Sequence, residues 1–200
     1  MADILLLGPQ GAGKGTQGRL IAAEFGIPHV ATGDMLRAAI YADTDLGRQV
    51  KPLYDAGRLV PDDLMIALIR ERLAAADARE GFVLDGFPRT MPQAEALEEM
   101  LREIGRDLDV VFEFQLADQV GRERMLRRAA EESRTDDTPE AIDERLRLYH
   151  AETEPLVESL DLERVPVVED GRLVGILSRA VVQRRLAEDE PPPAEADIGD

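Results

Sequence analysis

The stretch Gly8-Pro9-Gln10-Gly11-Ala12-Gly13-Lys14-Gly15-Thr16 follows the apolar run Ile4–Leu7 and precedes a helical pattern over Gln17–Phe25. Strand, glycine-rich turn, lysine, hydroxyl residue and helix in this order are typical of a phosphate-binding loop. Backbone N–H groups can surround a polyphosphate only where no Cβ atom blocks the approach, which accounts for the four glycines. The helix N-terminus and Lys14 add positive charge. We therefore predict phosphate binding here, with the Thr16 hydroxyl near Mg²⁺; a turn without a ligand explains fewer of these features.

Composition narrows the class of protein. The 200 residues, 44% of them hydrophobic, suit one domain of ordinary size. The absence of cysteine excludes disulfides and a cysteine-ligated zinc site. The net charge of −17 argues against nucleic acid as a partner, because phosphate backbones attract basic surfaces. No apolar run approaches the roughly 18 residues of a membrane span. Because the N-terminal residues do not resemble a signal peptide, we expect a cytoplasmic protein without membrane partners.

Apolar runs alternate with helical patterns along the chain, which predicts an α/β fold. We expect a phosphate-loop protein with three layers, αβα, around a five-stranded parallel sheet. The expected strands are Asp3–Leu7, Pro28–Val30, Phe82–Asp85, Val110–Phe114 and Arg164–Val168. One domain is predicted over residues 1–186. Residues 187–200 are acidic and proline-rich, so we expect a disordered tail there.

The position of the hydroxyl residue in the loop narrows the family. In the usual phosphate loop Ser or Thr directly follows the lysine, but here Gly15 intervenes before Thr16. This Gly-Lys-Gly-Thr order resembles the nucleoside monophosphate kinases, and adenylate kinases above all. A second run, Asp85-Gly86-Phe87-Pro88-Arg89, closely resembles a signature of the same family. The resemblance covers about residues 3–171. One irregularity is that the loop proline stands at Pro9, one place earlier than the family's usual position.

The resemblance implies a site for AMP as the phosphoryl acceptor, in a small helical subdomain at about residues 31–60. By this resemblance Thr32 contacts the base and Arg37 the phosphate, while Arg89 binds the phosphate and Gln93 the adenine. The whole implied AMP set is Thr32, Arg37, Arg58, Leu59, Val60, Gly86, Phe87, Pro88, Arg89, Gln93, Arg134 and Arg145.

The ATP side is implied by the loop and by a helix that begins at Asp118. Arg124 and Arg128 are four residues apart and share one helix face. They resemble the family's arginine pair before the lid, in which the first stacks on the ATP base and the second reaches the phosphates. A solvated face paired with glutamates is the alternative. Residues 133–137 resemble a short-lid signature, and the lid is expected at about 128–138. The implied ATP set is Gly11, Ala12, Gly13, Lys14, Gly15, Thr16, Arg124, Arg128 and Gly171.

The implied reaction is reversible phosphoryl transfer from MgATP to AMP, giving two ADP, in nucleotide homeostasis and salvage. Such a transfer needs alignment and charge neutralisation more than covalent help. Mg²⁺ is expected near Thr16 and Asp85, because an aspartate ending an apolar strand in a phosphate-loop protein can hold Mg²⁺ through water; no zinc is expected. We expect a monomer. The alternatives are a uridylate/cytidylate kinase on the same fold and a non-catalytic nucleotide-sensing module. The expected catalytic residues are Lys14, Arg89, Arg128, Arg134 and Arg145.

The segment after residue 164 fits two patterns. Leu173, Ile176, Leu177, Ala180 and Val181 share a helical face, which predicts a helix after the fifth strand. The same segment resembles half of a cystathionine-β-synthase-type module, in which a strand, an Asp-Gly turn and a second strand come before a helix. We favour the helix directly after the fifth strand. The two histidines, His29 and His150, are expected to have no catalytic role.

Overall fold

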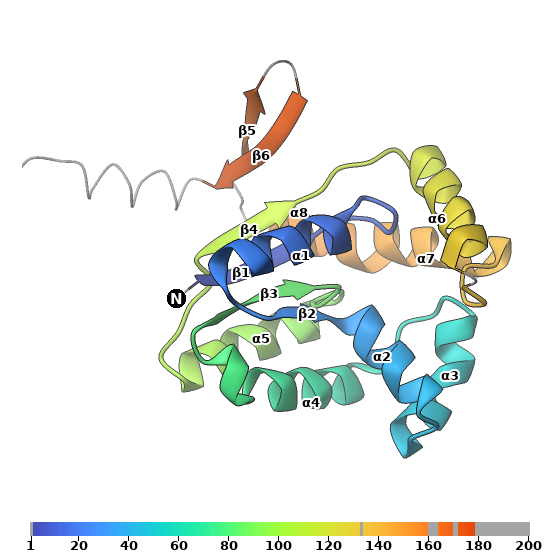
Figure 1. The fold of residues 1–200 in the computed structure, drawn as a ribbon, viewed down its shortest axis with the longest axis horizontal. Coiled ribbons are helices and arrows are strands. Elements are labelled where there is room, and N and C mark those ends of the chain that lie inside the picture. The colour runs from blue at the N-terminus through green and yellow to red at the C-terminus, as the bar shows by residue number, and fades with distance from the viewer. Residues whose placement is uncertain (1, 133, 160–163, 170–171, 179–200) are drawn as a thin grey trace, which may run out of the picture. The chain divides into compact units, whose positions relative to one another are not determined.

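The computed structural model describes residues 2–132, 134–159, 164–169 and 172–178 (Figure 1). The chain divides into two compact units, Met1–Asp161 and Leu162–Asp200, and each is described by itself. The first unit contains β1 (Ala2–Leu7), α1 (Lys14–Phe25), β2 (His29–Ala31), α2 (Thr32–Tyr41), α3 (Asp45–Asp55), α4 (Asp62–Leu73), η1 (Ala76–Ala78), β3 (Gly81–Asp85), α5 (Met91–Glu103), β4 (Val110–Glu113), α6 (Asp118–Glu132), α7 (Pro139–Leu148), a π-helical turn η2 (Tyr149–Thr153) and α8 (Glu154–Ser159). The second unit contains β5 (Arg164–Glu169) and β6 (Arg172–Ser178).

The first unit is built on a parallel sheet with the strand order β2-β3-β1-β4. The central strand β1 pairs with β3 on one side and β4 on the other, so that Leu5 lies opposite Leu84 and Val111. Parallel strands place all their carboxyl ends at one edge, where ligands bind in open α/β sheets. The glycine-rich loop after β1 therefore lies at the same edge as the ends of β2 and β3.

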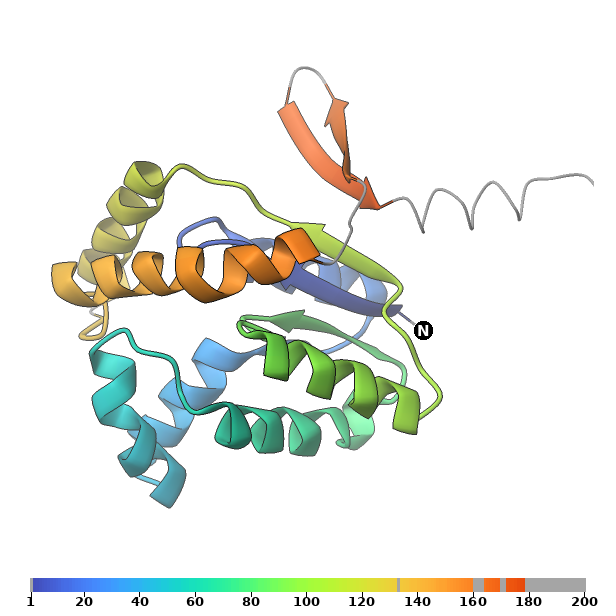
Figure 2. The same cartoon turned by 180° about the vertical axis from the view of Figure 1, so that it is seen from behind.

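The strand residues point alternately to two hydrophobic cores. Ile4 and Leu6 pack with Ala22 of α1 on one face of the sheet. Leu5 and Leu7 pack on the other face with buried residues of α4, α5 and α8. This alternation follows from the period of two of a strand, and Figures 1 and 2 show α1 and the α4–α5 pair on opposite sides of the sheet. The predicted α/β class with a parallel sheet between helical layers is confirmed.

Two helix starts are stabilised by capping side chains. The Thr90 hydroxyl accepts a hydrogen bond from the backbone N–H of Gln93 at the start of α5. The Thr138 hydroxyl does the same for Ala141 in α7. Each contact satisfies a backbone donor that the first helical turn leaves free. None of the described helices is long and apolar enough to cross a membrane.

The helix α3 contains a proline. It runs from Asp45 to Asp55 as one helix with Pro52 inside it. Proline has a φ angle that suits a helix, and its missing N–H removes one hydrogen bond. The side chain of Val50 is 0% exposed and packs in the hydrophobic core that contains Leu5 and Leu7, which anchors α3 to the sheet side of the molecule.

The prediction of a fifth strand in the parallel sheet, followed by a helix, is wrong. Residues 164–169 do form a strand, β5, but it pairs with β6 in an antiparallel hairpin. Among the described residues the parallel sheet therefore has four strands. Leu173–Leu177 lie inside β6, as the alternative pattern indicates. An Asp-Gly pair between two β-rich runs is a strong hairpin signal, and it outweighs helical spacing over about two turns.

Other expectations for the C-terminal part lie outside the described residues. These are the contact of Gly171 with ATP, the helical positions Ala180 and Val181, the domain boundary after residue 186 and the tail at 187–200.

A buried ion pair joins β1 to the turn after α5. Asp3 is only 1% exposed, and Arg106 donates to both of its carboxylate oxygens, with an Nε–Oδ2 distance of 2.7 Å. Arg106 also donates to the Ala78 carbonyl at 2.9 Å, and its guanidinium lies 5.2 Å from the centre of the Phe82 ring. The pair is thus enclosed by protein on several sides.

We expect Asp3→Ala to lower the free energy of unfolding by about 3–5 kcal/mol, because it leaves the Arg106 charge buried without its partner. Urea denaturation measures this loss. The control is Asp77→Ala, which removes the partner of Arg72 from an exposed pair and should leave the unfolding midpoint nearly unchanged. Equal effects of the two substitutions would contradict the expectation.

Candidate active site

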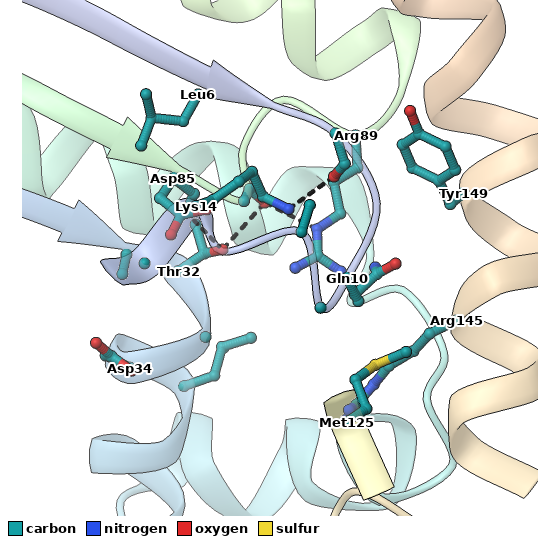
Figure 3. A pocket seen from close by; sticks show the side chains of 18 of the residues that line it. Leu6, Gln10, Lys14, Thr32, Asp34, Asp85, Arg89, Met125, Arg145 and Tyr149 are labelled. Atoms are coloured by element: carbon teal, nitrogen blue, oxygen red, sulfur yellow. Dashed lines mark hydrogen bonds between the residues drawn. The ribbon is translucent and has the colours of Figure 1, made fainter. Parts of the chain in front are cut away.

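A cavity of about 450 Å³ opens at the carboxyl edge of the parallel sheet. It is lined by the glycine-rich loop, by α2 and α3, and by α6 and α7. Figure 3 shows its inner wall, where Lys14, Asp85 and Arg89 lie close together and Arg145 enters from α7. The predicted site residues that line it are Gly11, Ala12, Gly13, Lys14, Gly15, Thr16, Thr32, Arg37, Arg58, Leu59, Val60, Asp85, Gly86, Pro88, Arg89, Gln93, Arg124, Arg128, Arg134 and Arg145.

One described residue of the predicted AMP set does not line this cavity. The side chain of Phe87 is 0% exposed and packs in the core beneath the site. Phe87 therefore supports the end of β3 from the side of the hydrophobic core. The other predicted residues that the structure describes come from stretches up to 134 positions apart, between Gly11 and Arg145, and the fold brings them to one place.

Two loop glycines are required by close backbone contacts. Gly8 has φ +133°, and a Cβ atom there would lie 2.3 Å from the Phe114 carbonyl oxygen. Gly11 has φ +80°, and its Cβ would lie 2.7 Å from the carbonyl oxygen of Gly121 in α6. No side chain fits at either distance, so the loop packs directly against the end of β4 and the backbone of α6. Gly121 is a part of the site that the sequence pattern did not reveal.

Lys14 is held inside the loop. Its ammonium donates to the carbonyl oxygens of Gly8 at 2.7 Å and Pro9 at 2.8 Å. Burial lowers the pKa of Lys14 from 10.5 to about 8; Asp85 opposes this shift, and Arg89 and Arg128 add to it. Within the described part of the chain, no carboxylate forms an ion pair with Lys14.

Arg89 is a second partly buried cation of the cavity wall. Its Nε donates to the Gly86 carbonyl at 2.8 Å, and the Thr153 hydroxyl donates to the Arg89 carbonyl at 3.0 Å. Burial, and then the nearby charge of Arg145, lower the pKa of Arg89. No carboxylate of the described ranges pairs with this guanidinium. Two partly buried positive charges without carboxylate partners are an arrangement that attracts anions.

Two further arginines are held by neighbouring aspartates. Arg128 of α6 donates to Asp137 Oδ2 at 2.9 and 2.6 Å. Arg145 of α7 donates to Asp137 Oδ1 and to Asp136 Oδ2, the latter at 2.9 Å. Burial opposes ionisation of Asp136, but the hydrogen bond and charge of Arg145 prevail and lower its pKa. The two carboxylates therefore fix both guanidinium groups at the cavity wall.

Tyr54 connects two of the predicted phosphate-binding arginines and was not predicted from the sequence. Its hydroxyl accepts a hydrogen bond from Arg37 Nη1 at 2.7 Å, and Arg37 also pairs with Asp34. The Arg145 guanidinium lies over the Tyr54 ring, 5.6 Å from its centre. Burial, and then the charge of Asp136, raise the pKa of Tyr54 and keep its phenol protonated. No local pattern around residue 54 signals this role, because both partners are distant in the sequence.

Three further predicted site residues, Arg124, Arg134 and Thr32, make contacts with neighbouring segments. Arg124 donates to the Gly11 carbonyl at 3.3 Å, which ties α6 to the loop. Arg134 pairs with Glu132 at 2.6 Å. The Thr32 hydroxyl donates to the Gly86 carbonyl at 3.0 Å, so its proton is directed toward the end of β3.

The residues for a magnesium site are compatible with that ion. Asp85 lies against the first turn of α1, where a Cβ on Gly15 would be 3.6 Å from its Oδ2. The Nε2 atom of His29 lies 3.5 Å from that oxygen. The described residues hold no group of three acidic or histidine side chains that is placed to bind a metal ion. Mg²⁺ does not require one, because it usually takes one or two carboxylates together with substrate phosphates and water.

A family model described as "Adenylate kinase" matches residues 6–164. The chain belongs to the adenylate kinase family. It is 49% identical over 158 residues to the adenylate kinase of Cyanothece sp., covering 79% of this chain and 81% of the relative. It is 45% identical over 155 residues to that of Stenotrophomonas maltophilia, covering 78% and 83%. It is also 48% identical over 159 residues to that of Methylobacterium nodulans, covering 76% and 80%.

The family assignment confirms the resemblance inferred from Gly8–Thr16 and Asp85–Arg89. It does not favour a uridylate/cytidylate kinase, since these relatives are named adenylate kinases. The match of the adenylate kinase model ends at the first residue of β5, so the β5–β6 hairpin lies beyond it. The roles that the sequence predicts for single residues stay predictions.

The low pKa of Lys14 predicts pH-dependent binding of ATP. A bound polyphosphate stabilises the charged ammonium, so above pH 8 binding must take up a proton. We expect the affinity for ATP to fall by up to about tenfold per pH unit between pH 8 and 10. Isothermal titration calorimetry in buffers of different ionisation enthalpy measures both affinity and proton uptake. An affinity that stays constant over this range would contradict the expectation.

Tyr54→Phe removes the hydroxyl that Arg37 contacts and keeps the ring beneath Arg145. We expect the KM for AMP to rise about tenfold, since a hydrogen bond to a charged group is worth about 1.5 kcal/mol, with the KM for ATP unchanged. Steady-state kinetics measure both constants. The matched control is Tyr41→Phe in α2, because Tyr41 is 94% exposed. If both variants show the same KM for AMP, Tyr54 has no such role.

Proposed function

We propose that this member of the adenylate kinase family catalyses reversible phosphoryl transfer from MgATP to AMP, giving two ADP, in nucleotide homeostasis and salvage. The observation that carries the proposal is the pair of partly buried cations, Lys14 and Arg89, which line the cavity without carboxylate partners in the described ranges. Moving a positive charge partly out of water without a partner costs free energy. Phosphate groups of two nucleotides that meet in this cavity offset that cost.

The two nucleotides are assigned to opposite sides of the cavity. ATP binds to the loop residues Gly11–Thr16, with Arg124 and Arg128 from α6 on its outer side. AMP binds between α2 and the end of β3, where Arg37 and Arg89 face its phosphate. The parallel alignment of β1 and β3 supports this division, because it puts the loop and Arg89 at adjacent strand ends. In-line transfer needs the two phosphates to meet at this point.

The arginines neutralise charge on the transferred group. A planar guanidinium can grip two phosphate oxygens at once, which suits the loose transition state of phosphoryl transfer. Arg128 and Arg145 are oriented in advance by Asp137, so little rearrangement is needed when charge develops. Arg134 adds a further positive charge from the lid side. No general base is needed, because the attacking phosphate oxygen of AMP is already an anion.

Asp85 and the Thr16 hydroxyl would hold Mg²⁺, directly or through water. The ion supplies positive charge and orientation to the ATP phosphates when bound. Asp85 would either ligate the ion or accept a hydrogen bond from a water bound to it, and its negative charge also stabilises the charged form of Lys14. His29 lies beside the Asp85 carboxylate, with Nε2 3.5 Å from Oδ2.

Water must be excluded, since it competes with AMP as acceptor. We assign this task to movement of the lid at about 128–138 and of the AMP subdomain at about 31–60. The monomeric state, the cytoplasmic location and the absence of nucleic-acid and membrane partners stay predictions.

A coupled assay tests the proposal directly. Purified protein is given MgATP with AMP, CMP, UMP or GMP, and ADP formation is followed. We expect turnover with AMP well above that with the other acceptors. A preference for UMP or CMP would replace the acceptor in the proposal, and no turnover with any acceptor would support the nucleotide-sensing alternative.

Lys14→Met is expected to lower kcat about 10³-fold, in line with the loss of one preorganised charge at a transferring group, without lowering the melting temperature. The control is Lys51→Met, which changes the chain's only other lysine, an exposed residue paired with Asp55. Near-normal activity of Lys14→Met would mean that the loop has another role.

A further inference from the structure

Asp62, the first residue of α4, does not line the cavity but is bonded to a residue that does. Its Oδ1 accepts a hydrogen bond from the side-chain Nε2 of Gln93 at 2.7 Å and another from the Thr90 hydroxyl at 3.0 Å. Gln93 is only 2% exposed, Thr90 is 8% exposed, and Gln93 lines the cavity. The carboxylate thus lies behind the side chain that the family resemblance assigns to adenine.

The side-chain amide of Gln93 is hydrogen-bonded at both its oxygen and its nitrogen. Its Oε1 accepts a hydrogen bond from the backbone N–H of Arg89 at 2.8 Å, while its Nε2 donates to Asp62. A carboxylate can only accept and a backbone N–H can only donate. Exchanging the amide oxygen and nitrogen would therefore set donor against donor and acceptor against acceptor. The orientation of this amide follows from its neighbours.

A fixed amide can distinguish two classes of purine. One N–H of Gln93 and one lone pair of its oxygen remain for a base. Adenine offers an amino donor at C6 beside an acceptor at N1, which complements this pair. Hypoxanthine and guanine offer an acceptor at O6 beside an N1–H donor, which would complement the exchanged amide. Sites that leave such buried polar groups mismatched discriminate strongly.

We infer that Asp62 is the positioning residue that sets the preference of the acceptor site for a 6-amino over a 6-oxo purine, by locking the amide of Gln93. The inference rests on the proposed function, because it assumes that the acceptor base lies at Gln93. Asp62 acts through Gln93 and has no contact of its own with the cavity.

A purely structural role is the competing explanation. Asp62 and Asp63 both lie in the first turn of α4, where a negative charge stabilises the helix N-terminus. Asp63 is exposed. It lies in the same first turn of α4, but the hydrogen bond from Gln93 goes to Asp62. Asp63→Ala is therefore the matched control for the loss of charge at this helix start.

The experiment compares AMP with IMP, which differ in this edge of the base and not in size. The values of kcat/KM for both acceptors, the KM for ATP and the melting temperature are measured for the wild type, Asp62→Ala, Asp62→Asn and Asp63→Ala. We expect Asp62→Ala to lower the ratio of kcat/KM for AMP to that for IMP about tenfold, as one hydrogen bond to a charged group is lost, with the KM for ATP unchanged. Asp62→Asn should keep most of the ratio, because its amide oxygen accepts the same two hydrogen bonds. Asp63→Ala should keep all of it.

Failure of the inference can be told apart from failure of the proposed function. A wild-type protein that does not phosphorylate AMP overturns the proposed function and the inference with it. A wild type that prefers AMP, together with an Asp62→Ala variant that keeps the same AMP-to-IMP ratio, overturns the inference alone, whatever the melting temperature does. Should Asp62→Ala not fold, Asp62→Leu keeps the same branched arrangement of side-chain heavy atoms without the carboxylate oxygens and carries the same comparison.

Discussion

The site depends on two partly buried positive charges that lie close to neighbouring strand ends. Lys14 follows β1 and Arg89 follows β3, and the parallel pairing of these strands brings the two cations together. Burial lowers the pKa of both groups, and the nearby charge of Arg145 adds to the effect on Arg89. Such a cluster costs stability and is tolerated because the two apolar cores of the sheet supply much more.

Three other arginines of the site, unlike Arg89, have carboxylate partners. Arg128 and Arg145 share Asp137, a carboxylate that is only 3% exposed. Arg37 has both a carboxylate and the Tyr54 hydroxyl as partners. These arrangements fix direction while leaving guanidinium edges at the cavity. The site thus combines two cations that lack a carboxylate with others whose position is set by one.

Much of the site could be predicted because its signals are local. The loop Gly8–Thr16 and the run Asp85–Arg89 each hold their functional residues in a stretch of at most nine residues. Thr90 and Thr138 likewise cap a backbone N–H only three positions further along the chain. The roles of Tyr54, Gly121 and Asp62 could not be predicted, because they depend on contacts with residues that are distant in the sequence. The hydrogen bond from Gln93 to Asp62, for example, spans 31 positions.

The error at the C-terminus has a different physical cause. The spacing of apolar residues after Gly171 suits a helix, but Val165–Val168 and Leu173–Leu177 also have strong strand propensity. A strand is stabilised by its partner, and the partner here is the next segment along the chain and not β4. Periodicity in one segment contains no information about which edge it will pair with.

The environment of Lys14 also has a consequence for chemical reactivity. An amine with a pKa of about 8 is neutral in roughly a tenth of molecules at pH 7, whereas an ordinary lysine is almost never neutral there. A neutral amine is a nucleophile, and the chain contains only one other lysine. Of the two lysine side chains, Lys14 is therefore the more open to acylating and aldehyde reagents, and its acylation would remove the positive charge that the loop offers to phosphate.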